Sequence, residues 1–234
     1  MDLSFLTIPA TLFMLTISFV WLFVLLLSLT YKKKERNAKL VNPPLFSVII
    51  PAHNEEKVIR DIVNDFRQQT YPYLEIIVVC HNCQDRTYEM VRSLEDERIK
   101  LMELRTDRSG KALALNEALK QSSGDIIVQM DADNRVEKDF LQKALLYFAD
   151  PETQAIQVRL GTKNASFNLL TKCQELEYDL FGMPFWEGRS KLGLSCTIGG
   201  TGVIIRKEIL EAVNGWENEL IEDFDLYCKL SQKG

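Results

Sequence analysis

Short apolar runs alternate with amphipathic segments through most of this 234-residue chain, and this alternation limits the fold more than any other feature. Buried-type strands are predicted at 45–52, 73–80, 98–104, 124–133 and 154–160, and helices at 54–69, 84–96, 110–123 and 137–149. Residues 199–213 predict a strand that leads into a short helix. Strands separated by helices in this way form βαβ units. The predicted fold class is therefore α/β, with a mostly parallel sheet covered by helices on both faces.

The N-terminal segment has a different character, because no charged residue occurs between Leu3 and Thr30. A run of about 20 apolar residues is enough to cross a bilayer. The basic sequence "KKKER" follows this run, whereas a signal peptide carries its positive charge in front of a shorter apolar core. By the positive-inside rule, we predict a single-pass anchor in the cell membrane at 1–31, a basic juxtamembrane linker at 32–44, and a cytoplasmic domain at 45–234.

Composition excludes several other classes of protein. The net charge of −5 argues against a nucleic-acid partner, which would require a basic face. Five cysteines, scattered except for one pair, do not form a disulfide framework. We therefore expect the globular part to lie in a reducing compartment.

Candidate functional residues follow the predicted strands, because ligands of open α/β sheets bind at the carboxyl ends of the strands. Asp131 and Asp133 offer two close carboxylates, which suit Mg²⁺ or Mn²⁺ together with phosphate oxygens, although a solvated turn has the same composition. Lys111 follows a glycine at a predicted helix start, a good place to hold an anion. This is not a Walker A loop, because Arg105 stands at the first glycine position and Ala112 follows the lysine.

The sequence "IIVVCHNCQDRT" at 76–87 ends its strand in a C-x-x-C pair, Cys80 and Cys83. Taken alone, this pair is compatible with a thiol oxidoreductase, with a zinc site completed by His53, or with a loop of another function.

Several motifs occur in a characteristic order: "PAHNEE", an aspartate in "NCQDRT", "GKALALN", "DAD", "GGTGVIIRKEIL…NGW" and "IEDFDL". From about Phe46 onward, the chain resembles the family 2 inverting glycosyltransferases of the GT-A (Rossmann-like) fold, in particular the branch related to polysaccharide synthases. The resemblance implies a metal-dependent enzyme that transfers a hexosyl or N-acetylhexosaminyl group. The expected donor is a nucleotide sugar, by family habit a UDP-sugar, and the expected acceptor is a hydroxyl of a glycan or of a lipid-linked molecule.

The resemblance also assigns roles to individual residues. It implies that Asp133 ligates Mg²⁺ or Mn²⁺, that Asp131 contacts the nucleotide or the metal shell, and that Asp223 is the catalytic base. The nucleotide-sugar-binding residues it implies are Pro51, Ala52, Glu55, His81, Asp85, Lys111, Asp131 and Asp133. A loop beside the donor sugar and the acceptor would contain Gly200, Thr201, Gly202 and Glu222. Trp216 fits either an acceptor site or the core.

The resemblance implies that the segment 80–87 is a nucleotide-binding loop and that its cysteines have no redox or metal-binding role. Cys83 fills a position where some family members carry cysteine, and Asp85 matches a family acid. His81 departs from the pattern, because the family usually has an acid there. A neutral imidazole can accept a hydrogen bond from a base N–H, or the change can indicate another nucleotide preference.

Processive family members carry a Q-x-x-R-W motif and further membrane helices beyond the position of Asp223, and this sequence ends before them. The resemblance therefore predicts a C-terminally truncated form. One alternative is a truncated or non-catalytic relic that keeps the fold and nucleotide binding. Others are a membrane-tethered thiol oxidoreductase, which leaves the acidic motifs unexplained, and a nucleotidyltransferase, which "GGTG" and the terminal "ED" disfavour.

Overall fold

The computed structural model describes residues 4–30, 42–108, 110–162, 164–194, 197–218 and 221–233. The chain forms two compact units, one of Met1–Lys34 with Arg159–Thr197 and the other of Glu35–Val158 with Ile198–Gly234. The second, larger unit contains every residue predicted to take part in the site. The domain boundaries predicted from the sequence stay a prediction.

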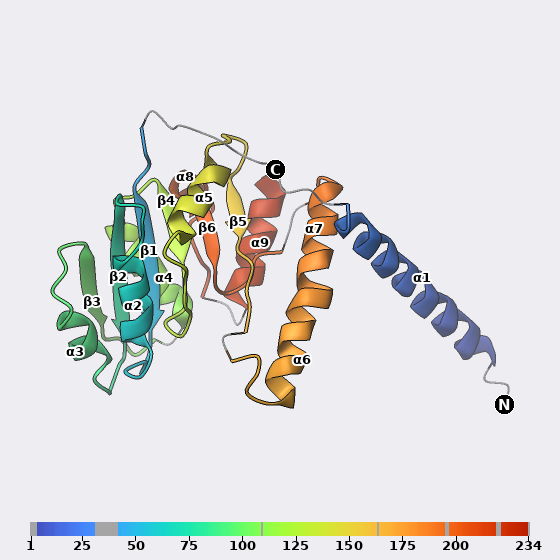
Figure 1. Ribbon diagram of the computed structural model, residues 1–234, viewed down its shortest axis with the longest axis horizontal. Helices are drawn as coiled ribbons and strands as arrows, with labels where there is room; N and C mark the ends of the chain where they lie inside the picture. The colour runs from blue at the N-terminus through green and yellow to red at the C-terminus, as the bar shows by residue number, and fades with distance from the viewer. Residues whose placement is uncertain are drawn as a thin grey trace. The chain divides into compact units, whose positions relative to one another are not determined.

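The described part of the larger unit contains a six-stranded sheet in the order β3-β2-β1-β4-β6-β5 (Figure 1). Its strands are β1 (Phe46–Ala52), β2 (Leu74–His81), β3 (Ile99–Leu104), β4 (Ile126–Gln129), β5 (Ala155–Gln157) and β6 (Val203–Arg206). Strand β1 pairs in parallel with β2 and β4, β2 pairs in parallel with β3, and β6 runs antiparallel to β4 and β5. The predicted mostly parallel α/β sheet is confirmed.

The helices of this unit cover both faces of the sheet. They are α2 (Ile59–Arg67), α3 (Thr87–Arg92), α4 (Lys111–Gln121), α5 (Phe140–Phe148), α8 (Lys207–Ala212) and α9 (Glu222–Lys233). Val48 and Ile50 of β1 pack in the core with α2, α3 and α5, whereas Ile49 packs in the core with α4, α8 and α9. Since successive side chains of a strand point to opposite faces, β1 is apolar almost throughout because both faces are buried.

Helix α2 begins later than its sequence pattern predicts. The pattern predicts a helix from Asn54, with that residue as the N-cap, but the helix begins at Ile59. Asn54 instead takes a left-handed conformation with φ of 58°, and its side-chain oxygen accepts a hydrogen bond from the Gln84 backbone N–H at 2.8 Å. The predicted N-cap was wrong because this side chain joins the loop after β1 to the loop after β2.

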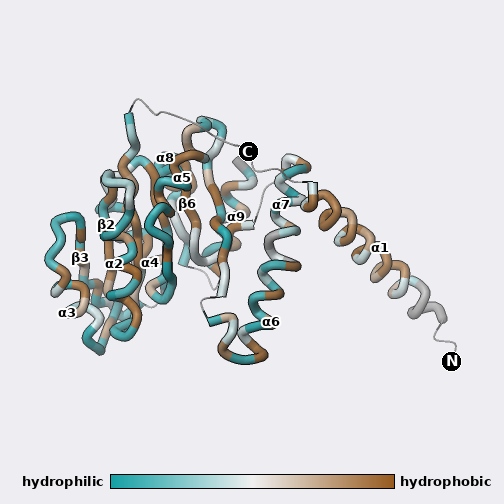
Figure 2. Tube along the Cα trace, in the orientation of Figure 1, coloured by the Kyte–Doolittle hydropathy of each residue, from teal (hydrophilic) through white to brown (hydrophobic). Residues whose placement is uncertain are grey.

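The regular elements of the smaller unit, among its described residues, are all helices. It contains α1 (Ser4–Ser28), α6 (Leu169–Glu177), the π-helix η1 (Tyr178–Gly182) and α7 (Met183–Lys191). Pro9–Ser28 has a mean hydropathy of 2.5 and is long and apolar enough to cross a membrane, and Figure 2 shows the hydrophobic colouring along α1. The helical segment 169–191 was not anticipated from the sequence.

Helices α1 and α7 pack closely against each other. The rings of Trp21 and Phe185 stack with centroids 5.1 Å apart. A Cβ atom added at Gly188 would lie only 2.4 Å from the Val24 carbonyl oxygen, so the absence of a side chain there permits the approach.

A buried carboxylate joins the beginnings of the parallel strands. Glu75 at the start of β2 accepts hydrogen bonds from the Ser47 hydroxyl at 2.5 Å and the Ser123 N–H at 2.6 Å, and pairs with the Lys100 ammonium at 2.7 Å. Burial acts to raise the pKa of Glu75, but the bonds from these three residues outweigh burial, and the pKa is lowered. The ionised form of Glu75 therefore stabilises the fold.

We expect Glu75→Ala to lower the free energy of unfolding by about 3 kcal/mol, because it leaves buried donors and the Lys100 ammonium without their acceptor. Thermal unfolding of the detergent-solubilised chain would measure this as a decrease of about 6 to 12 °C in Tm. Since a lowered carboxylate pKa stabilises only above the unfolded value, the gap between wild type and variant should narrow below about pH 4.

The matched control is Glu117→Ala, which removes a partly exposed carboxylate 2.6 Å from the Lys120 ammonium. This change should alter stability by less than about 0.5 kcal/mol. Equal Tm values for the Glu75 and Glu117 variants would contradict the structural role of Glu75.

Candidate functional site

A cavity of about 450 Å³ opens in the larger unit, beside the ends of β1, β2 and β4. The residues that line it are Pro51, Ala52, His53, Glu55, His81, Asn82, Gly110, Lys111, Ala114, Asp131, Ala132 and Asp133. Seven of the residues predicted for the site are among them. A smaller cavity of about 220 Å³ beside α3 and β3 contains none of the predicted residues.

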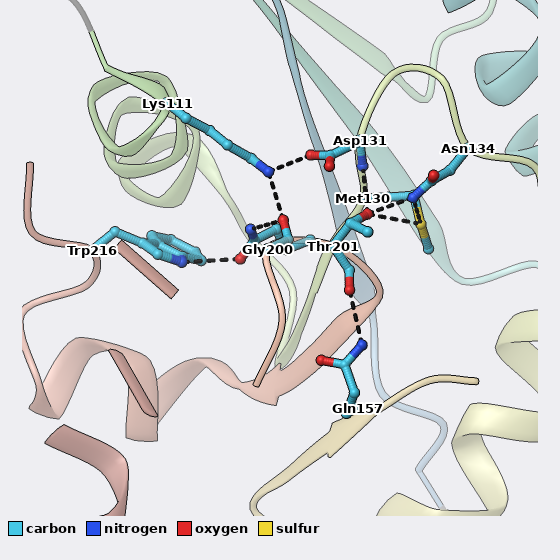
Figure 3. A network of polar contacts seen from close by, with 9 residues as sticks. Lys111, Met130, Asp131, Asn134, Gln157, Gly200, Thr201 and Trp216 are labelled. Carbon is cyan, nitrogen blue, oxygen red and sulfur yellow. Dashed lines mark hydrogen bonds and ion pairs between the residues drawn. The ribbon is translucent and has the colours of Figure 1, made fainter. Parts of the chain in front are cut away.

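Lys111, the first residue of α4, places its ammonium at the centre of the polar groups (Figure 3). It forms an ion pair with Asp131 and donates a hydrogen bond to the Gly200 carbonyl oxygen at 2.5 Å. Burial raises the pKa of Asp131, the Lys111 charge opposes that rise, and the charges of Asp133 and Glu222 add to it. The cavity therefore holds more negative than positive charge.

The Gly200 carbonyl oxygen has a second donor. The Gln129 side chain at the end of β4 donates to it at 2.8 Å, and the oxygen of the same amide accepts from the Trp216 indole N–H at 3.0 Å. Gln129 is 2% exposed and Trp216 is 3% exposed. Asn116 on α4 fixes Trp216 further through two bonds to its backbone, at 2.6 and 3.1 Å. Trp216 is thus a core residue that supports the loop.

The adjacent part of the loop is held by side chains that the sequence did not single out. The Thr201 hydroxyl accepts from the Asp131 N–H at 3.0 Å and from the Asn134 amide at 2.5 Å. The Gln157 amide donates to the Thr201 carbonyl at 2.9 Å and accepts from the Gly199 N–H at 2.8 Å. Figure 3 shows most of these contacts around Thr201. The loop 199–201 is therefore tied to β4, β5 and the aspartate segment together.

The acidic residues Glu222 and Asp223 lie at the start of α9, and Asp223 reaches the same loop. A Cβ atom built on Gly200 would lie 3.6 Å from the Asp223 carboxylate and 3.8 Å from the Lys111 ammonium. The fold thus brings Asp223 within a side chain's width of Lys111, although 111 residues separate them in sequence. Gly202, at φ of 69°, ends the loop with its N–H bonded to the Gln129 carbonyl at 3.0 Å.

Asp85 lies behind the cavity rather than in its lining. Its carboxylate accepts from the Glu56 N–H at 3.0 Å and from both the N–H and the hydroxyl of Thr87, at 3.0 and 2.5 Å. Burial acts to raise its pKa, but these hydrogen bonds outweigh burial and lower it. In the structure Asp85 holds the loop that carries Glu55, and its predicted contact with a nucleotide stays a prediction.

Glu55, in the loop after β1, also lines the cavity, and the charges of nearby carboxylates act on it. Its N–H donates to the Thr87 hydroxyl at 2.8 Å. Burial raises the pKa of Glu55, the charges of Asp133, Asp85 and Asp131 raise it further, and His53 opposes them. A cation entering the cavity would relieve this repulsion among carboxylates.

His81 at the end of β2 is only 7% exposed, and its ring nitrogen Nε2 lies 3.1 Å from the Arg108 carbonyl oxygen. A carbonyl only accepts hydrogen bonds, so Nε2 carries the proton of this bond. In the neutral ring the other nitrogen, Nδ1, is then an acceptor. His81 is also among the residues that line the cavity.

Cys80, the first cysteine of the C-x-x-C pair, does not have the properties of a catalytic thiol. Cys80 is buried, and burial together with Cys83 raises its pKa to about 12. Catalytic dithiols have a thiol pKa below the ordinary value, the reverse of this shift. The Cys83 thiol instead donates to the Ala52 carbonyl at 3.4 Å, so the pair helps to pack the loop after β2 against β1.

Among the residues that the structure describes, no group of three or more His, Cys, Asp or Glu side chains is arranged to hold a metal ion by itself. Asp131 and Asp133 supply carboxylate oxygens at the cavity, and these suit a hard divalent cation that takes its other ligands from phosphate and water.

Residues 47–213 match the sequence profile of the family described as "Glycosyl transferase family 2". The chain belongs to this family. The prediction of a family 2 glycosyltransferase with the GT-A fold is therefore confirmed.

Two curated relatives and one solved structure are similar to this glycosyltransferase. The probable glycosyltransferase YdaM of Bacillus subtilis is 33% identical over 244 residues, which cover 96% of this chain and 58% of YdaM. The beta-monoglucosyldiacylglycerol synthase of Synechocystis is 34% identical over 200 residues, covering 83% of this chain and 42% of the relative. The chain thus spans about half the length of these curated relatives.

The third comparison is structural. The mannosyltransferase PcManGT from Pyrobaculum calidifontis, solved in complex with GDP-Man and Mn²⁺, has a TM-score of 0.70 and 25% sequence identity. The similarity covers 94% of this chain and 63% of PcManGT.

We expect Gln129→Leu in this glycosyltransferase to lower the free energy of unfolding by about 1 to 3 kcal/mol, because it leaves the buried Trp216 N–H without an acceptor. Adding Trp216→Phe removes that unsatisfied donor, so the double variant should be more stable than the sum of the two single changes predicts. Thermal unfolding of the four chains measures this coupling. Strict additivity would contradict the hydrogen bond between Gln129 and Trp216.

Proposed function

We propose that this glycosyltransferase transfers a sugar from a UDP-sugar to a hydroxyl of a glycan or lipid-linked acceptor, with inversion at the anomeric carbon. Helix α1 anchors it in the cell membrane with the larger unit in the cytoplasm. The observation that carries the proposal is the meeting of Lys111, Asp131, Asp223 and the Gly200 loop beside one cavity.

The diphosphate of the donor binds at the start of α4. The Lys111 ammonium and the N-terminus of this 11-residue helix both attract an anion there. Gly110 precedes them at φ of 132°, and a Cβ atom on it would lie 2.0 Å from the Asn218 amide oxygen. Only glycine therefore fits the turn that presents Lys111.

A divalent cation, Mg²⁺ or Mn²⁺, fits the same place, because three cavity-lining carboxylates face one ammonium. Asp133 would hold it, and Asp131 would contact its shell or the nucleotide. When bound, such an ion neutralises the negative charge that develops on a departing diphosphate. PcManGT, whose complex contains Mn²⁺ and GDP-Man, supports this assignment by similarity.

The acceptor hydroxyl needs a base, and Asp223 is that base. It lies beside Gly200 and close to Lys111, so a sugar attached to a diphosphate held at Lys111 lies within reach of an acceptor at Asp223. The base takes the proton as the acceptor oxygen attacks the anomeric carbon from the face opposite the diphosphate. A single displacement of this kind inverts the anomeric configuration and needs no nucleophile from the enzyme.

His81 recognises the base of the nucleotide. With Nε2 bonded to the Arg108 carbonyl, Nδ1 accepts a hydrogen bond from the uracil N3–H. Adenine and cytosine present an unprotonated ring nitrogen at the corresponding edge and cannot supply this donor. Guanine N1–H can also supply it, so the acceptor favours a uridine or guanosine nucleotide over an adenosine or cytidine one, and the choice of UDP rests on family resemblance.

The nature of the acceptor is supported by the relatives and by α1. The Synechocystis relative is named for a glycolipid that it synthesises, and α1 is apolar and long enough to place the enzyme at a membrane. The basic sequence "KKKER" directly after α1 favours a cytoplasmic larger unit.

We expect Asp133→Asn to abolish the increase in UDP affinity that Mn²⁺ causes, because it removes the carboxylate assigned to the ion. Calorimetry on the detergent-solubilised chain, with and without Mn²⁺, measures this directly. Glu137→Gln serves as the matched control, since it changes an exposed carboxylate four residues away. Unchanged Mn²⁺-stimulated binding in Asp133→Asn would remove the metal assignment, and no UDP binding by the wild type would favour the non-catalytic relic.

Unlike Asp133→Asn, Asp223→Asn should leave UDP binding unchanged. It should lower the rate of sugar transfer by at least about 100-fold, because the variant cannot remove the proton of the acceptor hydroxyl. Transfer from UDP-sugars to membrane glycolipid acceptors is measured in parallel with UDP binding. A normal transfer rate in this variant would show that another group acts as the base.

For His81→Phe we expect UDP affinity to decrease by about tenfold, the effect of one buried hydrogen bond. N3-methyl-UDP lacks the N3–H, so the wild type should bind it as weakly as the variant binds UDP. The variant should bind the two nucleotides equally well. If the wild type failed to distinguish UDP from its N3-methyl form, His81 would not read the base at that position.

A further inference from the structure

The smaller unit exposes a stripe of apolar side chains along α6 and η1. Leu169 is 77% exposed, and Leu176 and Leu180 are each 54% exposed. These residues, with the exposed Cys173, lie at spacings of four, three and four residues, which places them on one side of the helix. Complete burial of a leucine side chain is worth about 1.5 to 3 kcal/mol, so this stripe has a substantial tendency to find an apolar partner.

Two acidic side chains of the same helical run have partners within the unit. Glu175 accepts a hydrogen bond from the Thr162 N–H at 2.6 Å, and Asp179 pairs with Arg159 at 2.6 Å. A helix that covers its own protein core buries its apolar side and exposes its polar side. In α6 no residue is buried, so its apolar stripe does not cover a core of this unit.

The stripe is continuous with the helix that packs on α1. Helix α6, η1 and α7 follow one another without interruption from Leu169 to Lys191. Phe185 stacks on Trp21, and further along the two helices Lys191 donates to the Thr30 carbonyl at 3.0 Å. The contacts proceed in the same order along both helices. They lie in the C-terminal part of the apolar α1, next to the position where the basic run follows.

We propose that α6 and η1 contact the lipid bilayer, with Leu169, Leu176 and Leu180 directed into the acyl region. The occupant of the stripe is lipid, because the stripe continues into a helix that packs on the apolar α1 near its end. The unit then contacts the membrane through two elements. This inference rests on the anchoring part of the proposed function and not on the proposed chemistry.

The native Cys173 allows a direct test in the full chain, reconstituted in vesicles of phosphatidylcholine and phosphatidylglycerol. Cys83, Cys196 and Cys228 are replaced by serine, and the buried Cys80 is kept. Cys173 is then labelled with the environment-sensitive fluorophore NBD. We expect blue-shifted emission and strong quenching by lipids that carry a doxyl group on the acyl chain.

The matched control moves the label by one residue, to Gln174→Cys in a Cys173→Ser background, about 100° around the helix. Quenching there should be several-fold weaker. Equal quenching at both positions, or water-like emission at both, would overturn the proposal. Blue-shifted emission at Cys173 without lipid quenching, reversed by diluting the protein in lipid, would indicate a second copy of the chain on the stripe and would also overturn it.

A second label position separates this proposal from the anchor. Phe19→Cys lies on the exposed surface of α1 and should be quenched strongly by the same lipids. If position 19 is quenched and position 173 is not, the anchor stands and the lipid contact of α6 is wrong. If neither is quenched, both are wrong. Thermal unfolding of each labelled chain, compared with the wild type, shows that the substitutions preserve the fold, and no outcome depends on nucleotide binding or transfer.

Discussion

The carbonyl oxygen of Gly200 is the point on which the candidate site depends. It accepts one hydrogen bond from Lys111 at the start of α4 and another from Gln129 at the end of β4. The first bond orients the ammonium toward Asp131, and the second connects the loop to the buried Trp216. A Cβ atom on Gly200 would lie at van der Waals distance from both Asp223 and Lys111, so the loop lies close to both charges. The peptide group of Gly200 therefore connects the charged pair of Lys111 and Asp131 to the buried core around Trp216.

The parallel sheet explains why these groups meet. Strands β1, β2 and β4 point the same way, so Ala52, His81 and Asp131 arrive at the same edge although the chain between them forms helices. The antiparallel β6 returns beside β4 and begins at that same edge, which places Gly200 and Thr201 just before it. The order of strands thus assembles the candidate site from segments more than 140 residues apart in the sequence. The carboxylates that line the cavity make it an attractive place for cations and for the phosphates that accompany them.

Much of this could be predicted from the chain alone, and the exceptions have physical causes. The apolar runs identify the strands because both faces of the sheet are buried, and the motif order identifies Lys111, Asp131 and Asp223. Helix α2 begins five residues later than its pattern predicts, because Asn54 bonds to a distant loop and local pattern contains no information about that partner.

The supporting side chains were the harder part of the site. Gln129 was detectable in principle, since it is a polar residue inside the apolar run "IIVQM" and such a residue needs buried partners. Its partners Trp216 and Gly200 come from far along the chain, so their identity required the fold. The segment 169–191 was missed because its apolar stripe faces outward, whereas pattern reading assumes that apolar residues face a core.

The loops after β1 and β2 have a further consequence for how such a site can change over evolutionary time. Asn54 bonds to Gln84, Glu55 bonds to Thr87, and Glu56 bonds to Asp85, so the two loops are connected at three successive positions. A substitution at one of these positions therefore disturbs both loops, so the two loops are constrained to change together. His81 at the end of β2 lies outside these three links and bonds to the Arg108 carbonyl instead. A substitution there changes the lining of the cavity while the links between the loops are kept.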